Sequence, residues 1–283
     1  MKIVRILGGL GNQMFQYALY LSLREKGFES KIDITQLKQY KLHNGWELDS
    51  IFEISPSIAT YKEVKQYSWN RKNDYICRFN RHFLPAKRTE YLEKNYSVFA
   101  ENIFKDDNIK YIQGYWHNEK YFRDIRDQII ETYSFKTPTG KNLETLNIIS
   151  QTNSVSVHIR RGDYINHSYL GNVCSNEYYL KAISTMTKLI NNPIFFFFSD
   201  DIAYCKSNFK IPNAHFINWN MGNESYWDMF LMSSCKHNII ANSSFSWWGA
   251  WLNKNPKKKV IGPSIWNKRD KYFDVLPNSW MKI

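Results

Sequence analysis

Residues 154–164 read Ser-Val-Ser-Val-His-Ile-Arg-Arg-Gly-Asp-Tyr, and this stretch constrains the fold more than any other part of the chain. Its first half alternates polar residues with β-branched apolar ones, which predicts a half-buried β-strand. The strand runs into two arginines, a glycine and an aspartate. In an open α/β sheet, ligands bind beyond the carboxyl ends of the strands, and a guanidinium matches phosphate oxygens. The stretch therefore predicts an anion site that suits a nucleotide diphosphate. The alternative is an exposed charged turn in which Arg161 pairs with Asp163.

Composition limits the kinds of partner. The chain has 283 residues, of which 43% are hydrophobic, so it is long and apolar enough for a folded protein of one large or two medium domains. Its net charge of +12 indicates an anionic partner: nucleic acid, acidic lipid or a phosphorylated substrate. Basic residues concentrate over 62–94 and 254–271, either as solvated surface or as contacts to a membrane or an acceptor carrier. No RRM, KH or helix-turn-helix signature is present, so we expect no nucleic-acid partner.

The cysteines and the apolar segments indicate the cellular compartment. None of Cys77, Cys174, Cys205 and Cys235 forms a CxxC pair or a Cys/His cluster with zinc spacing. No apolar run approaches the roughly 20 residues that span a bilayer, and the N-terminus lacks a secretion-signal pattern. We therefore expect a cytoplasmic protein with reduced thiols, with peripheral contact to the inner face of a membrane as an open option.

A second candidate binding turn lies near the N-terminus. Residues 2–7 predict a short strand, which runs into Gly-Gly-Leu-Gly-Asn-Gln at 8–13 and then into a helix that ends near Gly27. A strand, a glycine-rich turn and a helix together offer backbone N–H groups to an anion. The turn matches neither the GxGxxG fingerprint nor a P-loop. A tight turn that needs glycine dihedrals is the alternative.

The remainder of the first half is less regular. Residues 35–105 mix aromatic and basic residues without clear periodicity, which predicts irregular helices and loops. A strand is expected over 110–116 and a helix over 118–133. The Thr-Pro-Thr-Gly break that follows predicts a domain boundary. We expect domains over 1–145, on the acceptor side, and 146–283, on the donor side, with a return of the last segment to the first domain as an option.

From residue 154 onward, predicted strands and helices alternate, which favours a parallel sheet covered by helices on both faces. Polar residues follow three of these strands, at 158–163, 199–201 and 242–244. Because the carboxyl ends of parallel strands meet at one edge, we expect a single nucleotide site there. Ser243 and Ser244 open a predicted helix, where each is either an N-cap or a phosphate contact.

An aspartate inside an apolar helix and a missing motif refine the chemistry. Asp228 lies in a largely apolar predicted helix over 224–235, where its carboxylate could accept two hydrogen bonds from guanine. Asp-x-Asp, the spacing with which many nucleotide-sugar enzymes chelate a cation, does not occur in the sequence. We therefore expect arginine to neutralise the diphosphate, with no essential metal and no cofactor.

Three motifs together resemble the α-1,2-fucosyltransferase family, glycosyltransferase family 11. They are GGLGNQMFQYA at 8–18, HIRRGDY at 158–164 and NSSFSWWGA at 242–250, in the family's order. The resemblance covers residues 3 to about 265, is least clear over 35–105, and is to the soluble bacterial members. It implies a GT-B-type α/β fold with two Rossmann-like domains that face a cleft.

The resemblance also implies an activity. L-Fucose would pass with inversion from GDP-β-L-fucose to the 2-hydroxyl of a galactose in an oligosaccharide, with a lipid-linked glycan of O-antigen or lipopolysaccharide synthesis as a plausible acceptor. Another GDP-sugar-dependent transferase is the alternative, and a basic nucleic-acid-binding protein is a more distant one.

The resemblance and the positions of polar residues in the sequence together suggest roles for individual residues. Arg160 would contact the β-phosphate, and Asp163 and Asn12 are the other predicted catalytic residues. Asp163 is either the base that activates the acceptor or a structural partner of Arg161. The predicted donor-binding residues are Gly9, Gly11, Gln13, His158, Arg161, Asp200, Asp228, Asn242, Ser243, Ser244 and Phe245.

Overall fold

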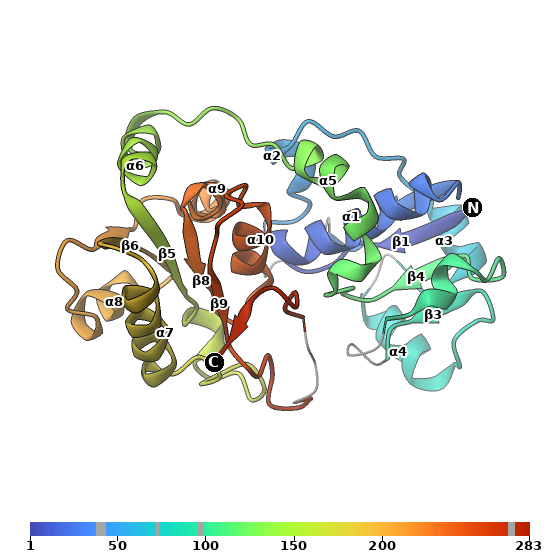
Figure 1. Ribbon diagram of the computed structural model, residues 1–283. Helices are drawn as coiled ribbons and strands as arrows, with labels where there is room; N and C mark the ends of the chain where they lie inside the picture. Colours follow the sequence, from blue (N-terminus) through green and yellow to red (C-terminus); the bar gives the residue numbers. More distant parts are fainter. Residues whose placement is uncertain (38–43, 72–73, 95–98, 271–274) are drawn as a thin grey trace. The chain divides into compact units, whose positions relative to one another are not determined.

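The computed structural model describes residues 1–283 except 38–43, 72–73, 95–98 and 271–274. The chain divides into two compact units, Met1–Phe135 and Lys136–Ile283 (Figure 1). Each unit contains its own parallel sheet with helices around it, so the predicted α/β class with parallel sheets is confirmed. None of the described helices is both long enough and apolar enough to cross a membrane.

The first unit is built on a four-stranded sheet in the order β2-β1-β4-β3, with all neighbours parallel. Its strands are β1 (Lys2–Arg5), β2 (Ser30–Asp33), β3 (Glu90–Leu92) and β4 (Tyr111–Gln113). Its helices are α1 (Leu10–Glu25), α2 (Leu48–Ile51), α3 (Tyr61–Tyr67), α4 (Asp74–Phe83) and α5 (Arg126–Thr132), with 3-10 helices η2 (Glu101–Phe104), η3 (Glu119–Tyr121) and η4 (Arg123–Ile125). The predicted glycine-rich turn leads from β1 into α1, which is buried over most of its length.

Two predictions for this unit were wrong in extent. The expected helix over 118–133 is two 3-10 helices followed by the shorter α5. It is interrupted because Phe122 departs from helical dihedrals, with φ −146° and ψ 8°, and because the Asn118 side chain caps η3 by accepting from the Lys120 N–H. The expected strand over 110–116 ends at Gln113, since Trp116 adopts a left-handed backbone with φ 59°.

The second unit contains a six-stranded parallel sheet in the order β10-β9-β8-β5-β6-β7. Its strands are β5 (Asn153–Ile159), β6 (Pro193–Ser199), β7 (His215–Ile217), β8 (His237–Ile239), β9 (Val260–Gly262) and β10 (Met281–Lys282). Its helices are α6 (Gly140–Gln151), α7 (Asn176–Leu189), α8 (Ile202–Asn208), α9 (Tyr226–Ser234) and α10 (Ser244–Leu252), with 3-10 helices η5 (Gly162–Tyr164) and η6 (Gly222–Glu224). The last described segment contributes β10, which pairs with β9 at the edge of this sheet.

Strand β5 lies in the interior of the second sheet, between β8 and β6. Its apolar residues, such as Val155 and Val157, belong to one buried cluster with α7 and α8. Its alternate residues meet other partners: the Ser156 hydroxyl accepts from Asn238 on β8, and the His158 ring lies 5.8 Å from Phe245 of α10. Because side chains alternate along a strand, one face of β5 packs in the apolar cluster and the other carries Ser156 and His158. The strand then ends in a polar turn.

Candidate active site

The arginine turn begins where β5 ends. The Arg160 guanidinium contacts two carboxylates, with Nη2 2.8 Å from Asp163 Oδ1 and Nη1 3.0 Å from Asp200 Oδ2. These partners follow different strands, since Asp163 lies in η5 and Asp200 directly follows β6. About one third of the Arg160 side chain (34%) remains exposed. The guanidinium is therefore oriented in advance and still accessible to a ligand.

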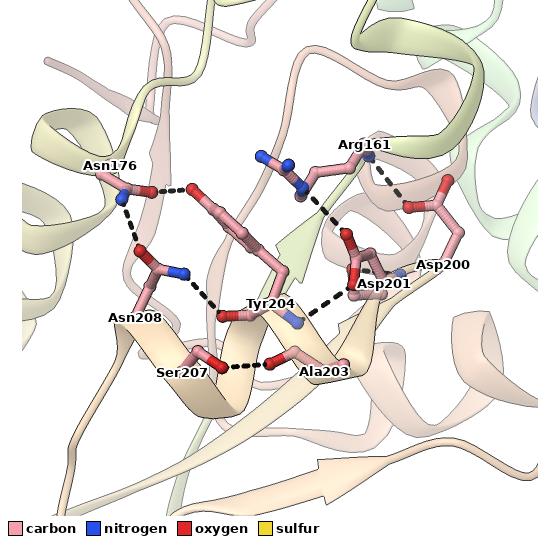
Figure 2. A network of polar contacts seen from close by, with 9 residues as sticks. Arg161, Asn176, Asp200, Asp201, Ala203, Tyr204, Ser207 and Asn208 are labelled. Carbon is pink, nitrogen blue, oxygen red and sulfur yellow. Dashed lines mark hydrogen bonds and ion pairs between the residues drawn. The ribbon is translucent and has the colours of Figure 1, made fainter.

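Arg161 is held by a different carboxylate. Its Nε lies 3.1 Å from Asp201 Oδ2, and its guanidinium lies 3.5 Å from the centre of the Tyr204 ring (Figure 2). Asp201 also caps α8 by accepting from the Tyr204 N–H. The pairing of Arg161 with Asp163 that the sequence left open is therefore wrong: because the cap of α8 places Asp201 at Arg161, Asp163 pairs with Arg160 instead.

Asp200 connects the two arginines. One of its oxygens contacts the Arg160 guanidinium. The other accepts the backbone N–H of Arg161 at 2.9 Å (Figure 2). Gly162 allows this approach, since a Cβ at that position would lie 2.8 Å from Asp200 Oδ2. The predicted site residues Arg160, Arg161, Asp163 and Asp200 thus form one cluster at the carboxyl edge of the sheet.

His158 is buried beside this cluster. Burial lowers the pKa of His158 to about 3, with the charge of Arg160 acting in the same direction, so the ring is neutral at physiological pH. Its Nδ1 is buried, and none of the residues that the structure describes offers it a hydrogen bond. Since buried polar atoms are normally paired, the free nitrogen is a candidate contact for a bound ligand.

The 242–244 segment meets the same edge of the sheet. The Asn242 carbonyl accepts from the Tyr164 hydroxyl at 3.3 Å, which connects it to the arginine turn. Its side-chain amide donates to the carbonyls of Leu170 and Trp266, so it fastens two loops. Ser243 occupies the N-cap position of α10, but its side chain makes no capping bond. The hydroxyl is thus not used as the N-cap alternative would require, and it stands at the positive end of a helix.

Asp228 belongs to a separate polar cluster. Its Oδ1 accepts from the Asn220 amide at 2.8 Å, and Asn220 and Asn142 exchange two side-chain hydrogen bonds of 2.9 Å. Burial raises the pKa of Asp228 to about 7, and the hydrogen bond from Asn220 opposes that rise. At neutral pH this carboxyl is therefore poised between its two protonation states.

In the first unit, Gln13 holds the glycine-rich turn together. This fully buried side chain donates to the Gly8 carbonyl at 2.9 Å and to the Gly45 carbonyl at 2.7 Å, and it accepts the Glu47 N–H at 3.1 Å. Both amide hydrogens and the oxygen are engaged by the main chain. Although we predicted a donor contact for Gln13, its side chain is thus occupied by the scaffold.

The other predicted residues of this turn begin α1. Gly9 is its N-cap residue, with an extended backbone, and Gly11 is buried in its first turn. The side chain of Asn12 is only partly buried, and its Oδ1 lies 2.9 Å from His117 Nε2. Burial lowers the pKa of His117 to about 3. Asn12 is thus positioned by a neutral imidazole from the loop that follows β4.

Two residues of this edge, Glu93 and His117, were missed by the sequence analysis. Glu93 follows β3, and its Oε2 accepts the N–H groups of Tyr115 and Trp116 at 2.7 and 3.2 Å. Burial raises the pKa of Glu93 to about 7, and these two N–H bonds oppose the rise. His117 follows the strand predicted over 110–116, which was the one available signal; no strand was predicted before Glu93, and neither residue belongs to a recognisable motif.

Comparison with known proteins identifies the family. The family model described as Glycosyl transferase family 11 matches residues 1–281. The chain belongs to glycosyl transferase family 11. This family 11 chain is 37% identical to an alpha-1,2-colitosyltransferase of Escherichia coli over 99% of its own length and 98% of that protein. It is 32% identical to the Escherichia coli O-antigen biosynthesis glycosyltransferase WbnK over 98% of each chain. It is 24% identical to the galactoside 2-alpha-L-fucosyltransferase Sec1 of Mus musculus over 89% of its length and 64% of that protein.

A solved structure agrees on the fold. The fucosyltransferase NodZ from Bradyrhizobium matches with a TM-score of 0.50 at 15% identity, over 87% of this chain and 90% of that one. The family 11 glycosyltransferase thus has the GT-B-type α/β fold that the sequence predicted. Among its described residues, no group of three or more His, Cys, Asp or Glu is arranged to hold a metal ion.

Proposed function

We propose that this family 11 glycosyltransferase transfers L-fucose from GDP-β-L-fucose to the 2-hydroxyl of a galactose residue, with inversion at the anomeric carbon. The observation that carries the proposal is the Arg160 guanidinium, held between Asp163 and Asp200 at the carboxyl edge of a parallel sheet. Ligands bind at this edge in open α/β sheets. The similarity to an alpha-1,2-colitosyltransferase and to galactoside 2-alpha-L-fucosyltransferase Sec1 supports the 1,2 linkage.

Arg160 carries the largest electrostatic contribution in the proposed reaction. Negative charge grows on the β-phosphate as its bond to the sugar breaks, and a preorganised donor aimed at developing charge contributes roughly 3–4 kcal/mol, or about 10²–10³ in rate. In the free protein the two carboxylates occupy the guanidinium. Asp163, which is 56% exposed, is easier to displace than Asp200, which is 25% exposed. We therefore propose that phosphate oxygens replace Asp163 and that Asp200 continues to hold the Arg160 guanidinium in place.

Other polar groups of the second unit are proposed to bind the rest of the donor. Ser243 and Ser244, at the start of α10, suit phosphate oxygens because the hydroxyls and N–H groups of a helix N-terminus favour anions. The free Nδ1 of His158 and the carboxyl of Asp228 suit the guanine base. Charge neutralisation by Arg160, together with the lack of any Asp-x-Asp in the sequence, supports transfer without a metal ion or cofactor.

GDP-colitose is a second candidate donor. The 37% identity to an alpha-1,2-colitosyltransferase extends over nearly the whole chain, which favours it specifically. Colitose is fucose without its 3-hydroxyl, so the choice depends on a single hydroxyl of the sugar. A site built to hydrogen-bond that hydroxyl would reject colitose strongly, whereas an apolar site would not.

For the acceptor, we propose a galactose-containing glycan carried on a lipid at the inner face of the membrane. The similarity to O-antigen biosynthesis glycosyltransferase WbnK supports this acceptor class. The net charge of +12 suits both a pyrophosphate-linked carrier and an acidic membrane, and peripheral contact with that membrane is part of the proposal.

GDP or UDP release from four donors tests the proposal. GDP-fucose, GDP-colitose, GDP-mannose and UDP-galactose are compared with lactose as acceptor and EDTA present. We expect lactose-stimulated release from GDP-fucose, with a new α-1,2 linkage in the product. Stimulated release from GDP-colitose alone would transfer the assignment to the second candidate. No release and no binding of any GDP-sugar would contradict the proposal.

A further inference from the structure

Helix α4 presents large apolar side chains to solvent. Tyr75, Phe79 and Phe83 are 82%, 62% and 63% exposed, and their four-residue spacing places them along one face of the helix. Ile76 and Leu84 beside them are 50% and 38% exposed. Soluble proteins rarely gather such side chains in one patch unless the patch binds something.

The opposite side of α4 fixes this orientation. Cys77 is buried, and its sulfur accepts from the Gln36 amide at 2.9 Å and from the Arg71 N–H at 2.8 Å. Three residues further along the helix, Asn80 donates to the Trp69 carbonyl at 3.2 Å. The exposed aromatic face is thus the outer side of an anchored helix.

The surroundings of α4 are basic. Residues 61–94 contain nine Lys and Arg against four Asp and Glu. The Lys87 ammonium and the Arg71 guanidinium lie 4.6 and 5.8 Å from the ring of Trp69, whose carbonyl anchors α4, so cationic groups lie in the segment that holds this helix. Exposed aromatic residues in a basic segment are typical of helices that lie in the headgroup layer of an anionic membrane.

We propose that α4 docks this glycosyltransferase on an acidic phospholipid bilayer, with Phe79 and Phe83 inserted among the headgroups. The charge of the surrounding segment selects a lipid surface over an uncharged partner. This docking specifies the surface for the peripheral membrane contact of the proposed function and rests on that part of it, but it does not depend on the donor or on the sugar that is transferred.

Vesicle co-sedimentation tests the docking. Vesicles of phosphatidylcholine alone and with 30% phosphatidylglycerol are compared for the wild-type protein and for Phe79→Ser/Phe83→Ser. The matched control is Leu180→Ser/Leu189→Ser on α7, whose side chains are 54% and 46% exposed. The wild type and the control should bind anionic vesicles, more weakly at high salt. The α4 variant should bind about tenfold or more weakly, since each buried aromatic ring contributes to insertion.

Activity with lactose separates docking from catalysis, because all three proteins should transfer to this soluble acceptor equally well. Equal vesicle binding by the wild type and the α4 variant would overturn the proposal. So would a wild-type protein that binds neither vesicle but forms a dimer that the α4 substitutions dissociate, because α4 would then be a contact between copies of the chain.

Discussion

The two turns that follow β1 and β5 are held in opposite ways. The turn after β1 is fixed by neutral side chains: Gln13 and Gln16 are fully buried, and both bond to backbone groups. The turn after β5 is fixed by charges: Arg160 is paired with Asp163 and Asp200 and remains partly exposed.

The difference indicates that the turn after β1 is structural, whereas the turn after β5 can bind a ligand. Breaking a buried amide-to-backbone bond leaves an unsatisfied polar group, which costs about 1–3 kcal/mol, so such a turn keeps one conformation. A partly exposed ion pair contributes about 0–1 kcal/mol, so a ligand can replace one of its members cheaply. A carboxylate that pairs with Arg160 also presents the same kind of oxygen that a phosphate would bring.

The largest expected effect is on catalysis, from Arg160→Lys. The ammonium keeps the charge but loses the planar fork, so kcat should fall about 10²–10³-fold. The melting temperature should change little, because the two ion pairs are partly exposed. Steady-state kinetics and thermal unfolding of the same preparation check both statements. A kcat close to that of the wild type would remove Arg160 from its assigned role.

The next effect is on stability, from Gln13→Leu. The substitution leaves the Gly8 and Gly45 carbonyls and the Glu47 N–H without partners, and unfolding free energy should fall by about 3 kcal/mol. Asp163→Asn in the other turn should cost less than about 1 kcal/mol. Urea unfolding measures the two variants side by side. Similar losses for both would show that the two turns are not held differently.

Alanine at one glycine of each turn gives a smaller effect. Gly8 has φ 82°, and a Cβ there would lie 2.7 Å from the Asn12 amide, so Gly8→Ala should cost about 1–3 kcal/mol. Gly162 lacks a positive φ, and its Cβ would press on Asp200 instead. Gly162→Ala should therefore weaken GDP binding more than it lowers stability. Calorimetry and urea unfolding separate the two outcomes, and the reverse pattern would contradict the comparison.

The smallest effect is a pH dependence from Asp228. If its carboxylate accepts hydrogen bonds from guanine, GDP affinity should fall about tenfold from pH 8 to pH 6 as the group protonates around its pKa of about 7, and Asp228→Asn should remove that dependence. The native pKa lies above the ordinary value of 3.8, so the native state binds the proton more tightly. The residue's contribution to stability therefore falls as the pH rises through roughly 4 to 7. Identical pH profiles for the two proteins would reject the guanine contact.

Periodicity predicted the parts of the fold that depend on neighbouring residues. The alternation over 154–159 indicated β5, and the strands and helices after it indicated a parallel sheet. The single helix expected over 118–133 did not form, because a local cap at Asn118 and the non-helical dihedrals of Phe122 prevailed over an apolar spacing. Local caps of this kind compete with helix propensity and are hard to read from a single sequence.

The site could be predicted only in part, because many of its contacts join residues that are far apart in the chain. The motif at 158–163 indicated an anion site, but which carboxylate meets which arginine depends on the register of β5 with β6 and on the cap of α8. Glu93 was missed because its hydrogen-bond donors, the N–H groups of Tyr115 and Trp116, lie in a loop more than twenty residues later. For Gln13 the opposite happened. It belongs to a motif that suggested donor binding, but its side-chain amide donates to main-chain carbonyls.

The most direct test of the Arg160 assignment compares GDP with GMP. These ligands differ by the β-phosphate alone, and a hydrogen bond to a charged group contributes about 1.5–3 kcal/mol. Calorimetric titration should show that the wild type binds GDP at least about tenfold more tightly than GMP, and that Arg160→Ala binds both equally. An Arg160→Ala variant that keeps the full preference for GDP would place the β-phosphate elsewhere and contradict the account.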